Sequence, residues 1–436
     1  MPRVPWLELE EVYRGIATGR LKLIGWGASG SFKMAYAACP LRVSYLIDRS
    51  PALWGQSVWG LPVRSPSTLQ GEDPEKVVVL IYSAFLYGEE ILAELEALGP
   101  YRAIFPYTPL LAERFVRTLT DGIDPTLIRK PAARSDRAIL VQGPVLEGIT
   151  APLLRFYASR HPHDRLSLST WSSTPGNQLD AVAGLVDDLV LSDLPDCPGP
   201  QNRNLQRQST MAGLERLAGM GIRTVLKTRT DTLCAGEVLN RGAELQMAMP
   251  LPAALSKLGL RRRFIISERY TYKYLPYAVS DIAMFGDVAD HLLYWSAPDD
   301  LRSFSPFSPD WRAKSLRDFS RTAGIPEIYF FRSFCERIGR PLADSVEDHW
   351  AVLRDLFILM DESWFDLYFP KYGFDDVRVY GTGRTAGAIA HHGFWERLAA
   401  GENLTDEAQA VDIDNATFAD VGGIPPGLRE LIAGTP

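Results

Sequence analysis

Apolar and polar positions along this chain alternate in a way that predicts strands separated by helices. Short, almost wholly apolar runs recur in both halves, as expected for strands that are buried on both faces. Stretches with apolar residues at helical spacing, such as 89–98 and 153–159, lie between them. This alternation predicts an α/β protein with mostly parallel sheets. The expected strands are 21–24, 43–47, 77–82, 103–105, 138–141, 165–170, 185–191 and 223–227.

The periodicity weakens after Arg241. A strand is still expected at 264–266, a helix at 326–334, and a helix running into a strand over 349–360. The last 50 residues predict peripheral helices and loops.

A polar, proline-containing stretch at 118–137 predicts a linker. It divides the chain into an N-terminal Rossmann-like domain, 1–117, and a larger α/β domain, 138–400, followed by a tail of helices and loops, 401–436. A length of 436 residues fits two or three domains.

The first domain carries a glycine pattern between a strand and a helix-compatible stretch. Gly25, Gly27 and Gly30 follow the first strand, and Asp48 ends the second. Glycines in this context allow close approach of a phosphate to a helix N-terminus, and the acid can hold a ribose. A nucleotide or NAD is therefore a candidate ligand, while the alternative is a turn that serves the fold alone.

A polar stretch in the second domain concentrates amide and guanidinium groups without a carboxylate. We interpret residues 201–208 as a loop, in which Asn204, Arg207 and Gln208 are candidates for binding a phosphate or sugar. The alternative is a solvated helix face. A helix follows, with apolar residues at helical spacing, and Gly219 and Gly221 end it.

The strand after this helix ends on charged residues. Lys227, Arg229 and Asp231 lie at its carboxyl end, where open α/β sheets bind their ligands. They are candidates for holding a phosphate and a metal. A surface salt bridge after a core strand is the alternative.

Two other strand ends contribute candidates for binding a nucleotide. Gln142, Gly143 and Pro144 end the first strand of the second domain, where a base or ribose would lie; a simple tight turn is the alternative. Trp171 ends the next strand and is a candidate for stacking on a base, although aromatic residues in this position commonly serve packing.

Composition narrows the choice of partners and compartment. A net charge of −7 argues against a nucleic-acid binder, although it allows a local basic pocket. No apolar run approaches the roughly 20 residues of a membrane span, and the first residues lack the apolar core of a signal peptide. Four separated cysteines form no C-x-x-C pair, which favours reduced thiols in the cytoplasm over a zinc site.

Taken in order, the motifs of the second domain resemble a known family. The family is WavE, whose members act in lipopolysaccharide synthesis and are assigned to glycosyl transfer on a GT-A-like nucleotide-binding core. The likeness covers about residues 136–400 and depends on order and spacing. The motifs are Gln142-Gly143-Pro144, Ser169-Thr170-Trp171, Asn204 to Gln208, Lys227 to Asp231, Ser280-Asp281, Gly286, Asp290, Tyr294-Trp295, Pro326-Glu327 and Pro370-Lys371-Tyr372.

The first 110 or so residues lie outside that likeness. They resemble the small nucleotide-sugar-binding domain that precedes the left-handed helix of sugar acetyltransferases. No hexapeptide repeats follow, so acetyl transfer is not implied.

The WavE resemblance implies a nucleotide-sugar donor. It implies as acceptor a lipopolysaccharide, a capsule or another surface glycan, or a lipid-linked precursor, with peripheral association at the inner face of the membrane. A GT-A-like enzyme commonly holds the diphosphate through a divalent metal, Mn²⁺ or Mg²⁺. Asp231 is the candidate ligand, with His391 or His392 as a second. Alternatively Lys227 and Arg229 replace the metal, or the site is degenerate.

Inverting transfer needs a carboxylate that deprotonates the acceptor hydroxyl. Glu327, which follows Pro326 at the start of a predicted helix, and Asp281 are the candidates. An ordinary acidic residue in a helix's first turn is the alternative for Glu327.

Two rival functions remain open at this point. One is an NAD-dependent oxidoreductase or epimerase built on the glycine pattern of the first domain, although no Tyr-x-x-x-Lys dyad follows it. The other is a non-catalytic protein that binds nucleotide sugars in a polysaccharide-assembly complex.

Overall fold

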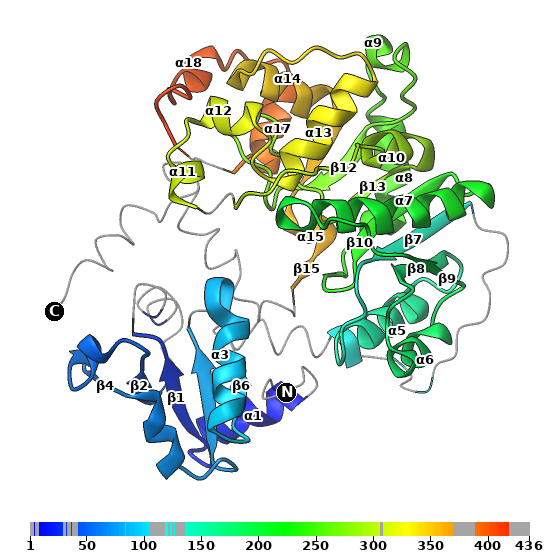
Figure 1. Cartoon of the computed structure of the whole chain (residues 1–436). Helices are drawn as coiled ribbons and strands as arrows, with labels where there is room; N and C mark the ends of the chain where they lie inside the picture. Colours follow the sequence, from blue (N-terminus) through cyan, green and yellow to red (C-terminus); the bar gives the residue numbers. More distant parts are fainter. Residues whose placement is uncertain are drawn as a thin grey trace. The chain divides into compact units, whose positions relative to one another are not determined.

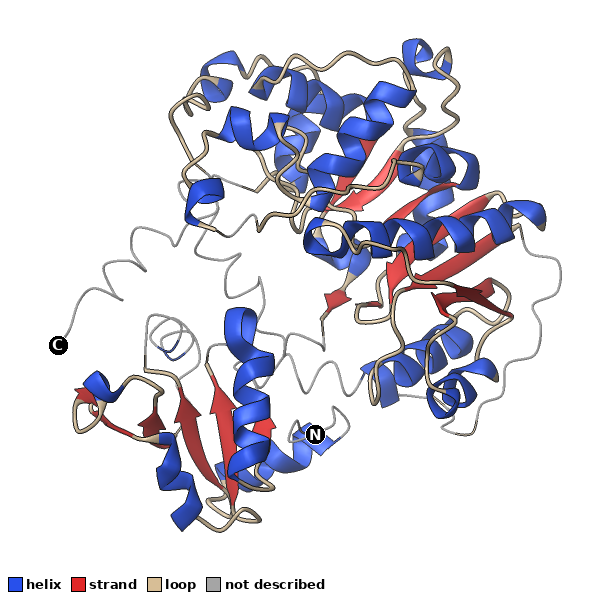
Figure 2. Ribbon diagram, in the orientation of Figure 1, coloured by secondary structure: helices blue, strands red, loops and turns tan. Residues whose placement is uncertain are grey.

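The computed structural model describes residues 8–28, 42–82, 84–104, 136–305, 308–369 and 389–417, with a few isolated positions outside these ranges. The described residues separate into two compact units, one within 1–122 and 368–384 and the other within 123–367 and 385–423. Each unit combines a sheet with helices (Figures 1 and 2), so the chain is an α/β protein. No helix in the described ranges is long and apolar enough to cross a membrane.

The first unit is built on a six-stranded sheet in the order β3-β4-β2-β1-β5-β6. All neighbouring strands run parallel except β3 and β4. Its described elements are α1 (Leu9–Ala17), β1 (Lys22–Trp26), β2 (Val43–Ile47), β3 (Ser57–Val58), β4 (Leu61–Arg64), β5 (Val77–Ile81), α3 (Ala84–Leu98) and β6 (Arg102–Ile104).

Two glycines of the pattern in this unit are required by the fold, Gly25 for close packing and Gly27 for its backbone conformation. Gly25 lies inside β1 and not in the turn after it, and a Cβ there would come within 2.6 Å of Leu46. Gly27 has φ +105°, a conformation that favours glycine. The Asp48 carboxylate accepts hydrogen bonds from the backbone amides of Ala28 and Ser50, both at 2.8 Å, so it braces the turn. Gly30 and the helix-compatible stretch after it lie outside the described residues.

The second unit is built on a seven-stranded sheet in the order β14-β12-β13-β10-β7-β8-β9. Only β13 runs antiparallel to its neighbours. The strands are nearly continuous apolar runs because helices cover both faces of the sheet. They are β7 (Arg137–Gln142), β8 (Arg165–Trp171), β9 (Asp188–Ser192), β10 (Thr224–Arg229), β12 (Phe264–Ser267), β13 (Met284–Asp287) and β14 (Phe357–Met360).

Helices pack on the two faces of this sheet (Figure 1). A Cβ on Gly242 of α8 would meet Phe285, whereas a Cβ on Gly286 would meet His291 of α10. Successive strand residues point to opposite faces, so α8 and α10 cover opposite faces. The helices used below are α5 (Thr150–Arg160), α6 (Gly176–Ala183), α7 (Arg203–Gly219), α8 (Val238–Ala248), α10 (Val288–Trp295), α12 (Leu316–Arg321), α13 (Pro326–Arg337), α14 (Val346–Leu356), α17 (His392–Ala399) and α18 (Thr405–Ala408).

Each strand expected from the apolar runs overlaps a strand of the structure. The expected loop at 201–208 is wrong, because α7 already begins at Arg203, after a 3₁₀ turn at Pro200–Asn202. The polar side chains that suggested a loop are instead the first turns of a helix. The elements α8, β13 and α10 were not expected, since they lie where the periodicity weakens. The family motif at 370–372 and most of the linker lie outside the described residues.

Candidate functional site

The sheet of the second unit has a topological switch point between β7 and β10. From β7 the chain moves outward through β8 and β9, and it then returns on the other side of β7 as β10. Ligands of open α/β sheets bind outside the carboxyl ends of the strands at such a point. Here these ends are tied together, because the amide of Thr230 donates to the carbonyl of Gln142 at 3.0 Å.

Close packing of these two strand ends requires Gly143. It has φ +122°, and a Cβ would lie 2.8 Å from Oγ1 of Thr230. Gln142 is buried, and its Oε1 accepts a hydrogen bond of 2.7 Å from Ser209 on α7. Pro144 is exposed. The turn predicted at 142–144 therefore joins β7 to β10 and α7.

Arg229 and Asp231 form a two-pronged ion pair at the end of β10. Nε and Nη2 of the arginine donate to the two carboxylate oxygens at 2.8 and 2.7 Å. Oγ1 of Thr232 also donates to this carboxylate. The side chain of Asp231 is 6% exposed and that of Arg229 is 27% exposed. Arg229 is thus the charged group of the pair that a ligand can reach.

The residues at this strand end do not make a set of metal ligands. Both oxygens of Asp231 accept hydrogen bonds from Arg229, and a guanidinium beside them opposes a second cation. No group of three or more His, Cys, Asp or Glu residues gathers within the described ranges. His392 instead bonds the carbonyl of Leu359, and His391 lies 3.6 Å from Glu268. A metal on Asp231 stays a prediction, and no chemical step below depends on it.

Lys227 is fully buried below this edge. Its Nζ donates to the backbone carbonyl of Asp281 at 2.6 Å and lies 4.3 Å from the centre of the Trp295 ring. Burial lowers the pKa of Lys227 to about 8. The lysine therefore anchors the loop before β13 and adds a buried positive charge near the end of β10.

Asp281 is held from two sides. In addition to the lysine bond to its carbonyl, its Oδ2 accepts a hydrogen bond of 2.8 Å from Gln206 on α7. The residue is only 3% exposed. Because α7 follows β9 and precedes β10, its first turns lie at the carboxyl edge of the sheet, and this brings Gln206 to the site.

Glu327 is the second carboxyl group of the cluster. It is half-buried in the first turn of α13, where Pro326 fixes the start of the helix. Burial raises its pKa to about 8, and the charge of Asp281 adds to this rise. Arg203 and Arg229 lie near enough to lower it in part. Both predicted candidates for the base thus lie together, close to the charged end of β10.

The raised pKa of Glu327 predicts a loss of stability with rising pH. The folded chain holds this proton between the ordinary value of 4.5 and about 8, where the unfolded chain has lost it. The contribution of Glu327 to stability is therefore complete below 4.5 and lost by about 8. Glutamine cannot ionise, so Glu327→Gln should match the original chain near pH 4 and be more stable near pH 8.5.

Melting temperatures of both proteins across this range test the expectation. The lowered pKa of Lys227 acts above pH 8 and is common to both, so the comparison removes most of its contribution. Equal melting temperatures at every pH would contradict the protonated state of Glu327.

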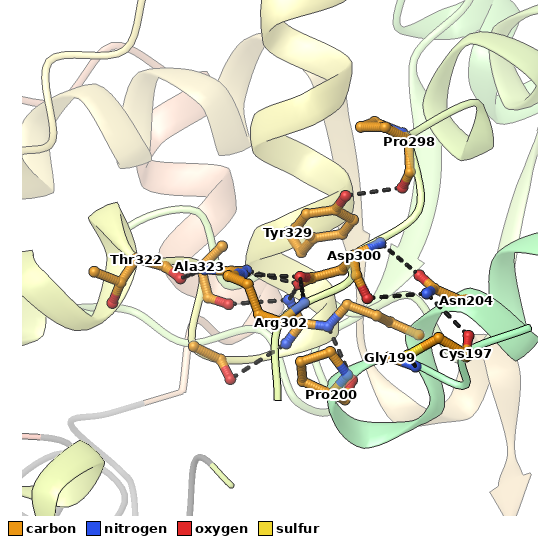
Figure 3. A network of polar contacts seen from close by, with 12 residues as sticks. Cys197, Gly199, Pro200, Asn204, Pro298, Asp300, Arg302, Thr322, Ala323 and Tyr329 are labelled. Atoms are coloured by element: carbon orange, nitrogen blue, oxygen red, sulfur yellow. Dashed lines mark hydrogen bonds and ion pairs between the residues drawn. The ribbon is translucent and has the colours of Figure 1, made fainter. Parts of the chain in front are cut away.

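A buried ion-pair network fixes the start of α7 (Figure 3). Arg203 is 0% exposed and donates to Oδ2 of Asp300 at 2.8 Å. Arg302 binds the same carboxylate through two bonds, of 2.8 and 2.7 Å. Asn204 exchanges hydrogen bonds with the backbone of Asp300, at 3.0 and 2.8 Å. The other partners are the carbonyls of Cys197, Pro200, Thr322, Ala323 and Gly324.

This network gives Asn204 a structural place. The residue is 1% exposed, and its amide oxygen and nitrogen both bond within the chain, so a ligand has no open approach to it. Its part in donor binding stays a prediction. The network also joins the loop after α10 to the segment before α13. Glu327 lies in the first turn of α13.

The hydrogen bonds and ion pairs found for the other predicted donor residues within the described ranges involve neither Asp281 nor Glu327. Arg207 pairs with Asp299 at 2.5 Å and is 21% exposed. The amide of Gln208 donates to the carbonyl of Asp193. Trp171 is the last residue of β8 and is 7% exposed, which fits packing. Arg207 and Gln208 stay candidates at the rim of the strand ends.

Sequence reasoning missed two contacts of the site. Gln206 was visible only as one amide among several, and its contact with Asp281 spans 75 positions of sequence. The pair of Arg203 and Asp300 spans 97 positions. Charge in the sequence identified neither, because no local pattern links them.

Comparison with known proteins does not assign this chain to a family. No family model matches the chain, and no curated protein matches it significantly. The likeness to the WavE family therefore stays a prediction, and the function is argued from the site.

Proposed function

We propose that this protein is a glycosyltransferase that moves a sugar from a nucleotide donor to a hydroxyl of a glycan acceptor. The observation that supports this most directly is the meeting of three groups at one sheet edge. They are the reachable guanidinium of Arg229 and the carboxyl groups of Asp281 and Glu327. One supplies charge for a leaving diphosphate, and the others can take a proton.

In this proposal the diphosphate of the donor lies at the ends of β7 and β10. Arg229 can offer parallel N–H groups to phosphate oxygens, which suits the planar guanidinium better than an ammonium. Binding a diphosphate there requires Arg229 to exchange Asp231 for phosphate. Gly143 lets the ends of β7 and β10 pack closely, so the proposed diphosphate site lies on a tightly joined pair of strand ends.

The chemical step follows from the acid–base states of the pair. Ionised Glu327 takes the proton of the acceptor hydroxyl as the oxygen attacks the anomeric carbon. The bond from that carbon to the phosphate oxygen breaks, and the nucleoside diphosphate leaves with its charge opposed by Arg229. A general base works best with a pKa near the working pH, and a pKa of about 8 meets this condition.

The acceptor class comes from the resemblance alone. A surface glycan, such as a lipopolysaccharide or a capsule, or its lipid-linked precursor, is the proposed acceptor. With such an acceptor, the proposed location is the cytoplasm, at the inner face of the membrane.

A thermal-shift screen tests the donor class. Donors linked to UDP, GDP, CMP and dTDP are compared with NAD, each with Mn²⁺ and with a chelator. A ligand that binds the folded state raises the melting temperature. A shift with one nucleotide sugar supports the proposal, and persistence of that shift in the chelator supports charge neutralisation by arginine. A shift with NAD alone would favour an oxidoreductase based on the first unit.

A further inference from the structure

The carboxylate of Asp281 owes its position to one side chain outside its own loop. Nε2 of Gln206 donates to Oδ2 at 2.8 Å, while Lys227 holds the backbone carbonyl of the same residue at 2.6 Å. The lysine thus fixes the loop and the glutamine fixes the carboxylate. With Asp281 3% exposed, bulk water contributes little to its orientation.

Gln206 lies on a rigid support. It is the fourth residue of α7, a helix of 17 residues. Oγ1 of Thr210 donates to its backbone carbonyl at 2.7 Å, and the buried pair of Arg203 and Asp300 anchors the start of the helix. A side chain on such a support can hold a carboxylate within a narrow range of positions.

Charged and titratable groups surround Glu327 from several elements. Asp281 lies on the loop before β13, and its negative charge opposes ionisation of Glu327. Arg203 on α7 and Arg229 on β10 favour ionisation. Lys227 on β10 and Tyr294 on α10 also interact with Glu327. Among the charged groups with the largest effects on the pKa of Glu327, Asp281 is the negative one. Its position therefore controls the pH at which Glu327 gives up its proton.

We propose that Gln206 is a positioning residue. By holding the carboxylate of Asp281 in place, it fixes the negative charge that opposes ionisation of Glu327. The two carboxyl groups are thereby given different tasks. Glu327 exchanges the proton, and the position of Asp281 sets the pH at which Glu327 can accept one.

The catalytic meaning of this arrangement rests on the proposed function, but the arrangement itself is tested without any substrate. The readout is the difference in melting temperature between a protein and its Glu327→Gln counterpart, followed from pH 4 to pH 10. As the pH rises, this difference begins to grow when Glu327 ionises in the unfolded chain. It stops growing at the pKa of Glu327 in the folded chain. We call the pH at which it stops growing the levelling point, and this pH is the measured quantity.

Five backgrounds are compared, each with and without Glu327→Gln. They are the original chain, Gln206→Met, Gln206→Ala, Asp281→Asn and Gln246→Met. The last is a control, because Gln246 on α8 also donates one amide hydrogen bond, but to a backbone carbonyl, that of Arg263, and not to a carboxylate. Gln206→Ala is the second variant at this position, and alanine has the highest helix propensity.

We expect the levelling point near pH 8 in the original chain and in Gln246→Met. Asp281→Asn should lower it by about one pH unit or more, because a neighbouring charge is removed. Gln206→Met and Gln206→Ala should lower it by part of that amount, because Asp281 is free to turn away. A levelling point in both Gln206 variants equal to that of Gln246→Met would overturn the proposal.

This outcome is separate from that of the proposed function. A shift of the levelling point in a protein that binds no nucleotide sugar would support the role of Gln206 and refute glycosyl transfer. In an active enzyme the pH profile of kcat should move in the same direction as the levelling point in each variant. A purely structural role of Gln206 would lower the melting temperature without moving either.

Discussion

Replacing Glu327 by glutamine should slow glycosyl transfer by about a hundredfold to ten-thousandfold, the usual contribution of a general base. Glutamine keeps the size and polarity of the side chain but cannot take the acceptor's proton. Donor binding should change little, because the diphosphate is assigned to Arg229. Steady-state kinetics with the donor found by thermal shift would show the loss in kcat.

Glu336→Gln provides the control for this substitution. Glu336 lies on the same helix, α13, but is exposed. It should transfer at the rate of the original chain. If Glu327→Gln also kept that rate, Glu327 would not be the base, and Asp281 would become the remaining candidate.

Replacing Asp300 by asparagine should destabilise the second unit by about 3–5 kcal/mol, as expected when a buried charge loses its partner. Arg203 is 0% exposed, and the substitution leaves it only carbonyl acceptors. Arg302 loses its partner too, but its side chain is 44% exposed and water can compensate for the loss. Urea unfolding followed by tryptophan fluorescence would measure the change.

The neighbouring aspartate gives a matched control. Asp299 also pairs with an arginine of α7, but it is 45% exposed and its partner Arg207 is 21% exposed. Exposed pairs contribute about 1 kcal/mol or less, so Asp299→Asn should have a small effect. Equal effects of the two substitutions would show that the network at the start of α7 does not depend on the buried charge.

Most strands of the two sheets could be predicted because each is a short apolar run. β7, for example, is buried along all but its first residue, and its sequence, RAILVQ, shows this directly. β13 could not be predicted in this way. It has only four residues, Met284–Asp287, and it is a strand because β10 and β12 pair with it on both sides. Its pairing partners lie 18 to 63 positions earlier in the chain, from Ile266 opposite Met284 to Thr224 opposite Asp287.

The sequence placed Lys227, Arg229 and Asp231 at a strand end, but it could not divide their tasks. Alternation along β10 cannot show that the lysine is fully buried against Trp295, or that the arginine and aspartate bond to each other. The same limit applies to Asn204. Its type and position suggested ligand binding, while its partner Asp300 lies 96 positions away. Burial and long-range partners decide such cases, and neither is a local property.

The measurement that most directly tests the account is calorimetric titration of the nucleotide sugar identified by thermal shift into the original chain and Arg229→Lys. Lysine keeps the positive charge but loses the two-pronged geometry. The account predicts binding weakened by about tenfold or more, the equivalent of one charge-assisted hydrogen bond. Equal affinities in the two proteins would contradict a diphosphate site at the ends of β7 and β10.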